Sequence, residues 1–189
     1  MNSKLVFISS FIKNPKEVAA VAQSSRYLIN RIIKNIDFKN AKRIVEYGPG
    51  TGIVTKALLN NVSKDAKIIC FELNPKLYNF MDKSIKDTRL IIINDDAEKA
   101  DYYLKKLKID GIDYALSGLP FSLINKESKK SILKKTKSFL KRDGKFIVYQ
   151  QYNGHLRSYL KDCFEKVTTG LEIRNIPPSY FYICEKIQK

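Results

Sequence analysis

From about residue 42 onward, short apolar runs alternate with longer polar stretches that carry a helical spacing of apolar residues. Short and nearly continuous apolar runs are typical of strands buried on both faces of a sheet. The longer stretches place apolar residues three and four positions apart, as at Leu77, Phe80, Met81 and Ile85. The alternation therefore predicts a parallel sheet with helices on both faces. The strand-like runs read RIVEYG, KIICFE, RLIIIN, IDYALS and KFIVYQ.

The last part of the chain departs from this alternation. FEKVTTGLEIRN and SYFYICEKI read as two strands with no long helix between them, which predicts an antiparallel end to the sheet. Together the pattern predicts an α/β protein with a Rossmann-like, seven-stranded, mostly parallel sheet, helices on both faces and an antiparallel last strand.

The first 40 residues predict a separate helical extension, and residues 41–189 predict the main domain. NPKE at 14–17 is a helix start signal, with a capping Asn, a Pro in the first turn and a Glu at the capping-box position. A second helix is expected after QSS, through Leu28 and Ile32. KLVFISSFIK at 4–13 predicts either a helix at a membrane surface or a helix packed on the core, and the pattern leaves both open.

The composition indicates which partners the protein binds and in which compartment it works. The formal net charge is +16, which favours polyanions such as nucleic acid or an anionic membrane face, although solubility alone would also explain it. Three widely spaced cysteines without a CxxC pair and a single histidine, His155, argue against a disulfide framework and a metal site. No apolar run approaches the roughly 18 residues of a spanning helix, and no signal peptide is evident, so a cytoplasmic protein is expected.

A glycine-rich turn, VEYGPGTG, follows the first predicted strand and precedes a helix. Gly48, Gly50 and Gly52 let the backbone bend sharply and approach a ligand, and the helix start behind them offers unpaired N–H groups. The spacing is GxGxG rather than the dinucleotide pattern GxGxxG, and no Lys-Ser/Thr pair follows as in a P-loop. On its own the turn suits a dinucleotide, a nucleoside or no ligand.

Acidic residues end the first three predicted strands, at Glu46, Glu72 and Asp96. The carboxyl ends of parallel strands meet at one edge of a sheet, so these acids are expected to converge. Glu72 can accept both hydroxyls of a ribose, and Asp96 can accept a hydrogen bond from an adenine amino group. The set suits a ligand with an amino group, a ribose and an adenine, and does not suit a pyrophosphate.

VEYGPGTG, FELNP, DDA and ALSGLPF, in this order over about residues 42–150, resemble the motifs of class I S-adenosylmethionine-dependent methyltransferases. The resemblance implies S-adenosylmethionine as cofactor and S-adenosylhomocysteine as product. It places the glycines beside the methionine part, Glu72 on the ribose, Asp96 at the adenine and Glu46 at the methionine amino group. Residues 23–25 would close over the methionine carboxylate or cap a helix. The expected cofactor set is Gln23, Ser24, Ser25, Glu46, Tyr47, Gly48, Gly50, Thr51, Gly52, Glu72, Leu73, Asp95, Asp96, Ala97, Ser117, Gly118 and Leu119.

The loop after the fourth predicted strand resembles the catalytic loop of enzymes that methylate the adenine amino group, which reads Asn-Leu-Pro-Tyr or Asn-Leu-Pro-Phe. Here it reads Gly118-Leu119-Pro120-Phe121, so the Asn that would polarise the amino group is missing. Ser117 would replace it only with a shifted register. The departure favours an acceptor that is already a nucleophilic amine, which needs only to lose a proton and reach the methyl group.

A second resemblance spans nearly the full chain. FIKNPKEVAAVAQSS, SGLPFSL, YQQYNG and RNIPPSYFY, in this order, resemble bacterial phosphatidylethanolamine N-methyltransferases. It implies phospholipid N-methylation, towards phosphatidylcholine, by an enzyme peripherally bound to the inner face of the membrane. No obligate protein partner is evident. The residues expected to position the substrate phosphate and amine are Tyr152, His155, Arg157, Arg174 and Tyr180.

Two other functions remain open at this point. One is an RNA or DNA adenine N6-methyltransferase related to rRNA adenine dimethyltransferases, and the other is a cofactor-sensing or RNA-binding module on the same fold. The lysine-rich stretch at 125–145 predicts a helix, with Lys129, Lys135, Lys137 and Lys141 among its cations. Its charged face would be a solvated surface or a basic patch on anionic lipid.

Overall fold

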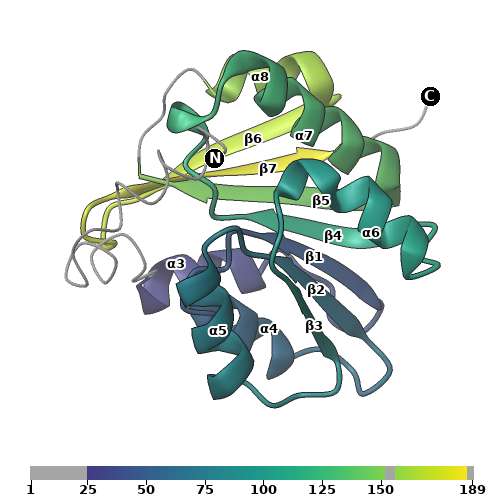
Figure 1. Ribbon diagram of the computed structural model, residues 1–189. Coiled ribbons are helices and arrows are strands. Elements are labelled where there is room, and N and C mark those ends of the chain that lie inside the picture. Colours follow the sequence, from purple (N-terminus) through teal and green to yellow (C-terminus); the bar gives the residue numbers. More distant parts are fainter. Residues whose placement is uncertain (1–24, 152–155, 187–189) are drawn as a thin grey trace.

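The computed structural model describes residues 25–151 and 156–186, which form one twisted seven-stranded sheet (Figure 1). The spatial order is β3-β2-β1-β4-β5-β7-β6, and β7 runs antiparallel to both of its neighbours. The predicted sheet and its antiparallel last strand are confirmed. The strands are β1 (Arg43–Tyr47), β2 (Lys67–Phe71), β3 (Leu90–Ile93), β4 (Ile112–Ser117), β5 (Leu140–Gln150), β6 (Lys166–Glu172) and β7 (Ser179–Glu185).

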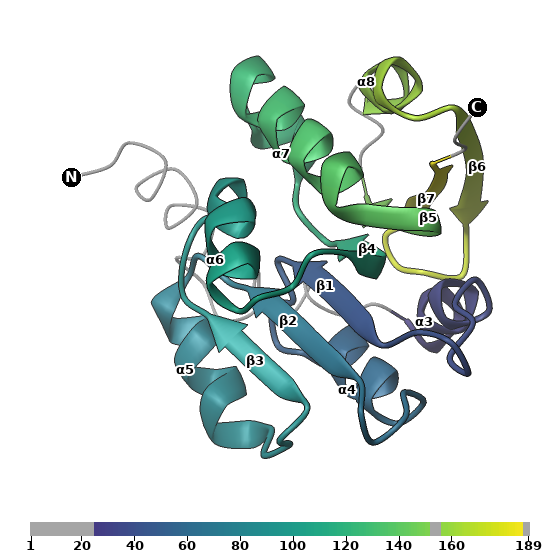
Figure 2. The same cartoon turned by 90° about the vertical axis from the view of Figure 1, so that its right-hand side faces the viewer.

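Helices cover both faces of the sheet (Figure 2). One face carries α3 (Arg26–Ile33), α4 (Ile53–Leu59) and α5 (Pro75–Ser84). The other carries α6 (Ala100–Lys106), α7 (Lys126–Phe139) and α8 (Leu156–Cys163). Side chains alternate along each strand, so that Ile44 packs on the first face and Val45 on the second. Two short 3-10 helices, η1 (Ala97–Lys99) and η2 (Phe121–Leu123), follow β3 and β4.

The helix expected after QSS is α3, which begins at a Ser25 cap and buries Leu28 and Ile32 in the same core as β1. The other two segments of the predicted extension, 4–13 and 14–17, lie outside the described residues. Among the described residues, no helix has the length and apolar content needed to cross a membrane.

The apolar stripe predicted for α5 is narrower in the structure. Met81 is fully buried, but Phe80 is 50 % exposed. Met81 and Ile85 reach the glycine-rich turn, where a Cβ added to Gly52 would lie 3.1 and 2.7 Å from their terminal carbons. Phe80 precedes Met81 by one residue, which turns its side chain about 100° around the helix and out of this contact.

The lysine-rich helix ends earlier than its sequence predicts. α7 stops at Phe139, and Leu140 begins β5, where it pairs with Ile112. Asp143 has a positive φ of 61°, which a continuing helix does not allow. Leu140 is buried as the first residue of the strand, and Lys141 therefore lies on β5 and not on the helix.

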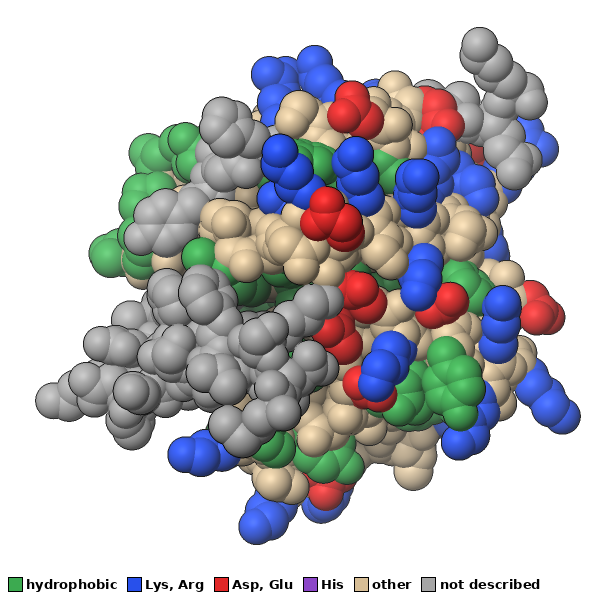
Figure 3. All heavy atoms as spheres, turned by 45° about the horizontal axis from the view of Figure 1, so that its top comes forward, with side chains coloured by type: hydrophobic (Ala, Val, Ile, Leu, Met, Phe, Trp, Pro, Cys, Tyr) green, Lys and Arg blue, Asp and Glu red, His purple; other side chains and the backbone are tan. Residues whose placement is uncertain are grey.

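The lysines of this segment also do not share one solvated face. Lys129 is only 6 % exposed and lies over the Tyr159 ring, while Lys135 and Lys137 form ion pairs with acids of neighbouring elements. The exposed lysines of α7 are Lys126, Lys130 and Lys134, and Figure 3 shows cationic side chains over this part of the molecule.

Candidate functional site

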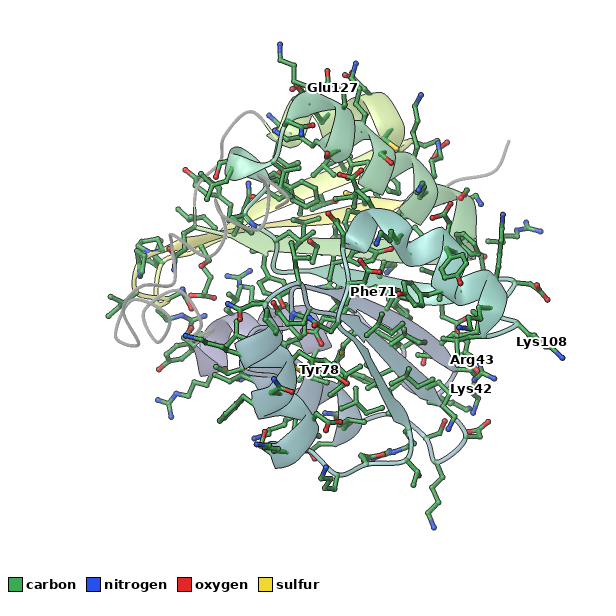
Figure 4. The ribbon with its side chains drawn as sticks, in the orientation of Figure 1. Lys42, Arg43, Phe71, Tyr78, Lys108 and Glu127 are labelled. Atoms are coloured by element: carbon green, nitrogen blue, oxygen red, sulfur yellow. The ribbon has the colours of Figure 1, made fainter. Side chains whose placement is uncertain are left out.

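The glycine-rich turn leads from β1 into α4 at the carboxyl-terminal edge of the sheet. Its first residue is tied to the neighbouring strand, because the Gly48 N–H donates to the Phe71 carbonyl over 2.9 Å. Figure 4 shows Phe71 near the centre of the molecule, away from Lys42 and Arg43 at the opposite edge. Gly50 has a φ of +62°, and a Cβ added there would meet no atom within 4 Å. At Gly50 the turn therefore presents its backbone to open space, as a ligand-binding turn does.

Glu72 lies directly behind this turn. Its side-chain carboxylate accepts the N–H groups of Gly50, over 3.0 Å, and of Asn74, over 2.9 Å. The residue is 6 % exposed, and burial raises the pKa of its carboxyl group. Each carboxylate oxygen can accept a further hydrogen bond. Glu72 thus holds the glycine-rich turn and keeps acceptor capacity for hydroxyl groups of a ligand.

The end of β3 forms the next part of the edge. Asp96 caps η1 by accepting the Glu98 N–H over 2.9 Å, and Asp95 accepts the Tyr103 hydroxyl over 2.8 Å. Asn94, which the sequence analysis did not single out, donates from its side chain to the Glu72 carbonyl over 2.7 Å. Thr51 and Leu73 are half-buried at the same edge, and Ala97 is buried.

Glu46 is fully buried in a polar cluster on the α4 side of β1. Thr55 donates to one carboxylate oxygen over 2.7 Å, and the Tyr149 hydroxyl donates to the other over 3.3 Å. The Cys70 thiol lies 3.7 Å from the carboxylate. Burial raises the pKa of Glu46 to about 7. Sequence reasoning missed Tyr149, because its pattern is that of an ordinary core strand residue and 103 positions separate it from Glu46.

Gly118 packs tightly against the glycine-rich turn. Its N–H donates to the Tyr47 carbonyl over 2.9 Å. A Cβ added at Gly118 would lie 2.9 Å from the Gly48 carbonyl oxygen and 3.0 and 3.1 Å from a ring carbon and the hydroxyl oxygen of Tyr149. A side chain at this position would therefore collide with backbone and ring atoms.

Two other residues of the expected cofactor set have buried side chains. Ser117 is fully buried, and its hydroxyl accepts the Leu119 N–H over 3.2 Å, within the loop itself. The Tyr47 ring lies in the core beneath α7, with its hydroxyl 3.2 Å from Thr136. Only the backbone of Tyr47 borders the glycine-rich turn.

The described residues of the expected substrate set lie on both sides of the sheet. Arg174 pairs with Glu172 on the α3 side of the sheet. Tyr180 packs against the core on the α7 and α8 side, and Arg157 is exposed on α8. Tyr152, His155, Gln23 and Ser24 lie outside the described residues.

Ser25 caps α3 by accepting the Leu28 N–H over 3.3 Å, and its own N–H donates to the Asn175 side chain over 2.7 Å. The helix-cap interpretation of this segment is therefore confirmed for Ser25. The second contact brings the start of α3 to the turn between β6 and β7.

The sequence model of the ribosomal RNA adenine dimethylase family matches residues 7–139, more than half of the chain. The chain belongs to this family. It is an S-adenosylmethionine-dependent N-methyltransferase. The class I methyltransferase fold that the motifs implied is thereby confirmed.

Two relatives differ in how much of their length this methyltransferase covers. It is 26 % identical to an ornithine lipid N-methyltransferase of Singulisphaera acidiphila over 190 residues, covering 100 % of this chain and 99 % of the relative. It is 34 % identical to ribosomal RNA small subunit methyltransferase A of Mesomycoplasma hyopneumoniae over 101 residues, which are 53 % of this chain and 36 % of the relative.

The fold is also that of the N-methyltransferase NodS from Bradyrhizobium japonicum, solved in complex with S-adenosylhomocysteine. The TM-score is 0.70 at 7 % identity, with 99 % of this chain and 100 % of the other covered. The edge described above fits such a cofactor, because the space beyond Gly50 is open and the Glu72 carboxylate lies behind it.

Proposed function

We propose that this methyltransferase acts on the amine of a lipid head group. Phosphatidylethanolamine, implied by the sequence motifs, and an ornithine lipid are the two candidate substrates. Support comes from the lipid-acting relative, which aligns from end to end. It also comes from the net charge of +16, which suits an anionic membrane surface.

The observation that carries the proposal is the closed space at Gly118. The adenine-methylating loop needs an Asn at this position, but the Gly48 carbonyl and the Tyr149 ring leave no room for its Cβ. Ser117 does not replace it, since its side chain is fully buried and bonded within the loop. An aliphatic amine has a lone pair outside any conjugated ring, so the missing amide is no obstacle to its methylation.

Methyl transfer to an amine depends mainly on the alignment of the amine with the methyl group. The bound cofactor supplies an electrophilic methyl group on a sulfonium centre. The glycine-rich turn and Glu72 hold the nucleoside and methionine parts in place, and the Gly118–Leu119 loop borders the position of the acceptor amine. The amine must be neutral to attack in line, and positioning of the two reactants supplies most of the rate.

A second candidate is methylation of an adenine in RNA. It is favoured by the family match over residues 7–139 and by the ribosomal RNA-acting relatives, although these are matched over only part of their length. Under this alternative, backbone groups of the loop would have to replace the Asn.

Methyl-labelled S-adenosylmethionine distinguishes the two. Purified protein is incubated in separate tubes with vesicles containing phosphatidylethanolamine, vesicles containing ornithine lipid, and total RNA. Label extracted into the organic phase with either lipid supports the proposal and identifies the head group. Label confined to the RNA would refute it.

A further inference from the structure

The turn between β6 and β7 exposes an unusual amount of apolar surface. Ile173 is 71 % exposed and Ile176 is 87 % exposed, and the exposed Pro177 and Pro178 follow directly. Leu171, two residues before Ile173, is 41 % exposed. Single exposed apolar residues are common, but a contiguous group of this kind marks an interaction surface. Figure 3 shows hydrophobic side chains gathered at the side of the molecule where Figure 1 places this turn.

This apolar tip, defined as residues 173–178, lies at the edge of the sheet where methyl transfer takes place. β6 and β5 both run antiparallel to β7, so they share a direction. The tip follows the carboxyl end of β6, and the glycine-rich turn and the Gly118 loop follow the carboxyl ends of β1 and β4, which run parallel to β5. A surface that binds the tip therefore faces the same edge as the cofactor.

The Asn175 side chain of the tip forms its hydrogen bonds within the protein. Asn175 is 2 % exposed, and its side chain donates to the Pro177 carbonyl over 2.8 Å and to the Ser179 hydroxyl over 2.9 Å. Its side-chain oxygen accepts the Ser25 N–H over 2.7 Å. These bonds fix the turn and leave its apolar side chains outside. The paired Asn175 side chain and Pro177 carbonyl are also cheaper to bring into a membrane interface than unsatisfied polar groups are.

The charge around the tip is positive. Arg31 and Arg174 both pair with Glu172, over 2.9 and 2.7 Å, so two cations surround one carboxylate. The Arg174 guanidinium, with that of Arg31, lowers the pKa of Glu172 to about 2. Arg26, at the start of α3, is exposed as well. Residues 173–178 carry no acidic side chain.

We propose that the apolar tip inserts into the surface of an anionic lipid bilayer and holds the methyl-transfer edge of the sheet against the head groups. The apolar side chains of the tip suit the acyl boundary of such a surface, and the nearby arginines suit its negative head groups. Isoleucines offer no stacking plane to bases, so the same features suit RNA poorly. The inference rests on the proposed action on a lipid amine, but its test is separate.

The chain contains no tryptophan, which makes a direct test possible. Ile176→Trp places a single reporter at the tip, and Leu107→Trp places one at the opposite edge of the sheet, next to the Lys108 marked in Figure 4. Vesicles of phosphatidylcholine with phosphatidylglycerol should shift the Ile176→Trp emission to the blue, and brominated lipids should quench it. The Leu107→Trp emission should not change.

A loss-of-binding experiment complements the reporter. The double variant Ile173→Ser/Ile176→Ser should lower the partition coefficient onto anionic vesicles by about tenfold or more. Leu107→Ser, 37 % exposed in the parent, is the matched control and should bind as the parent does. Both variants should keep the parent's melting temperature and cofactor affinity, because the tip is exposed and is not part of the cofactor site.

Three results would overturn the proposal. A reporter that is blue-shifted without vesicles and unaffected by them means that the chain itself or a second copy covers the tip. A shift caused by RNA and not by vesicles means a nucleic-acid surface. Unchanged vesicle binding of the double serine variant means that the tip is not the anchor. If lipid is methylated while the tip stays in water, the proposed function survives without this anchor, and an inserted tip without lipid methylation means the reverse.

Discussion

The two halves of the sheet's carboxyl-terminal edge are built by different means. At the ends of β1, β2 and β3, backbone atoms and buried carboxylates form the site, as where the Gly50 N–H donates to Glu72. Around β5, β6 and β7, distant segments of the chain meet, as where the Ser25 backbone N–H donates to the Asn175 side chain, 150 positions away. The contact between the glycine-rich turn and Glu72 therefore joins consecutive elements of the chain, whereas the turn between β6 and β7 depends on long-range packing.

The largest effect is expected in the cofactor half. Glu72→Ala removes the acceptor of two N–H groups and the group expected on the ribose. Hydrogen bonds to a charged group contribute about 1.5–3 kcal/mol each, so the dissociation constant for S-adenosylmethionine should rise by a factor of at least about 100. Isothermal titration calorimetry measures it. Glu127 is an exposed acid on α7 (Figure 4), and Glu127→Ala should leave the affinity unchanged. A Glu72→Ala protein with the parent's affinity would show that Glu72 does not contact the cofactor.

This difference explains what the sequence could predict. The glycines, Glu72 and the strand order follow from local patterns, because a strand end, a turn and a helix start are contiguous. The Tyr149 hydroxyl at Glu46 could not be predicted, since only the pairing of β5 with β4, and of β4 with β1, brings the two together. The exposure of Phe80 and the end of α7 at Phe139 likewise depend on what the sheet leaves open or buries.

Gly118 and Gly50 differ in the space around them. Gly118→Ala places a Cβ against the Gly48 carbonyl and Tyr149, so it should lower the free energy of unfolding by about 1–3 kcal/mol. Gly50→Ala places its Cβ in open space, and only the positive φ costs stability, about 1–2 kcal/mol. Its main effect should be on S-adenosylmethionine affinity. Denaturant unfolding and calorimetry on both variants separate the effects, and an equal loss of affinity in both would contradict this division.

The buried carboxyl group of Glu46 predicts a pH dependence. Its folded-state pKa of about 7 lies above the ordinary value of 4.5, so the folded state binds the proton more tightly. The resulting stability is complete below pH 4.5 and is lost as the pH rises through 7. Glu46→Gln removes this titration, and its free energy of unfolding relative to the parent should improve by about 2–3 kcal/mol from pH 5 to pH 8.

Urea unfolding of both proteins, without cofactor, at the two pH values measures this difference. Glu127→Gln serves as the exposed control and should show no such change. A Glu46→Gln difference that stays constant with pH would mean that Glu46 remains ionised throughout.

At the anchor of the apolar tip, the effect of a substitution should fall on stability alone. Asn175→Ala leaves the Ser25 N–H without its partner and should cost about 1–3 kcal/mol of unfolding free energy, with little effect on cofactor affinity. Asn61→Ala removes an exposed contact to a helix carbonyl and should cost less than about 0.5 kcal/mol. Similar melting curves for the two variants would show that the long-range contact does not hold the turn.

A competition in one tube decides whether the acceptor is a lipid amine or an adenine in RNA. The protein, methyl-labelled S-adenosylmethionine, vesicles with both amine lipids and small-subunit ribosomal RNA are incubated together and then separated by solvent extraction. We expect label in the lipid phase, none in the RNA, and none at all when the lipid amines are acetylated beforehand. Label in RNA adenine, undiminished by the vesicles, would show that the acceptor is RNA and not a lipid amine.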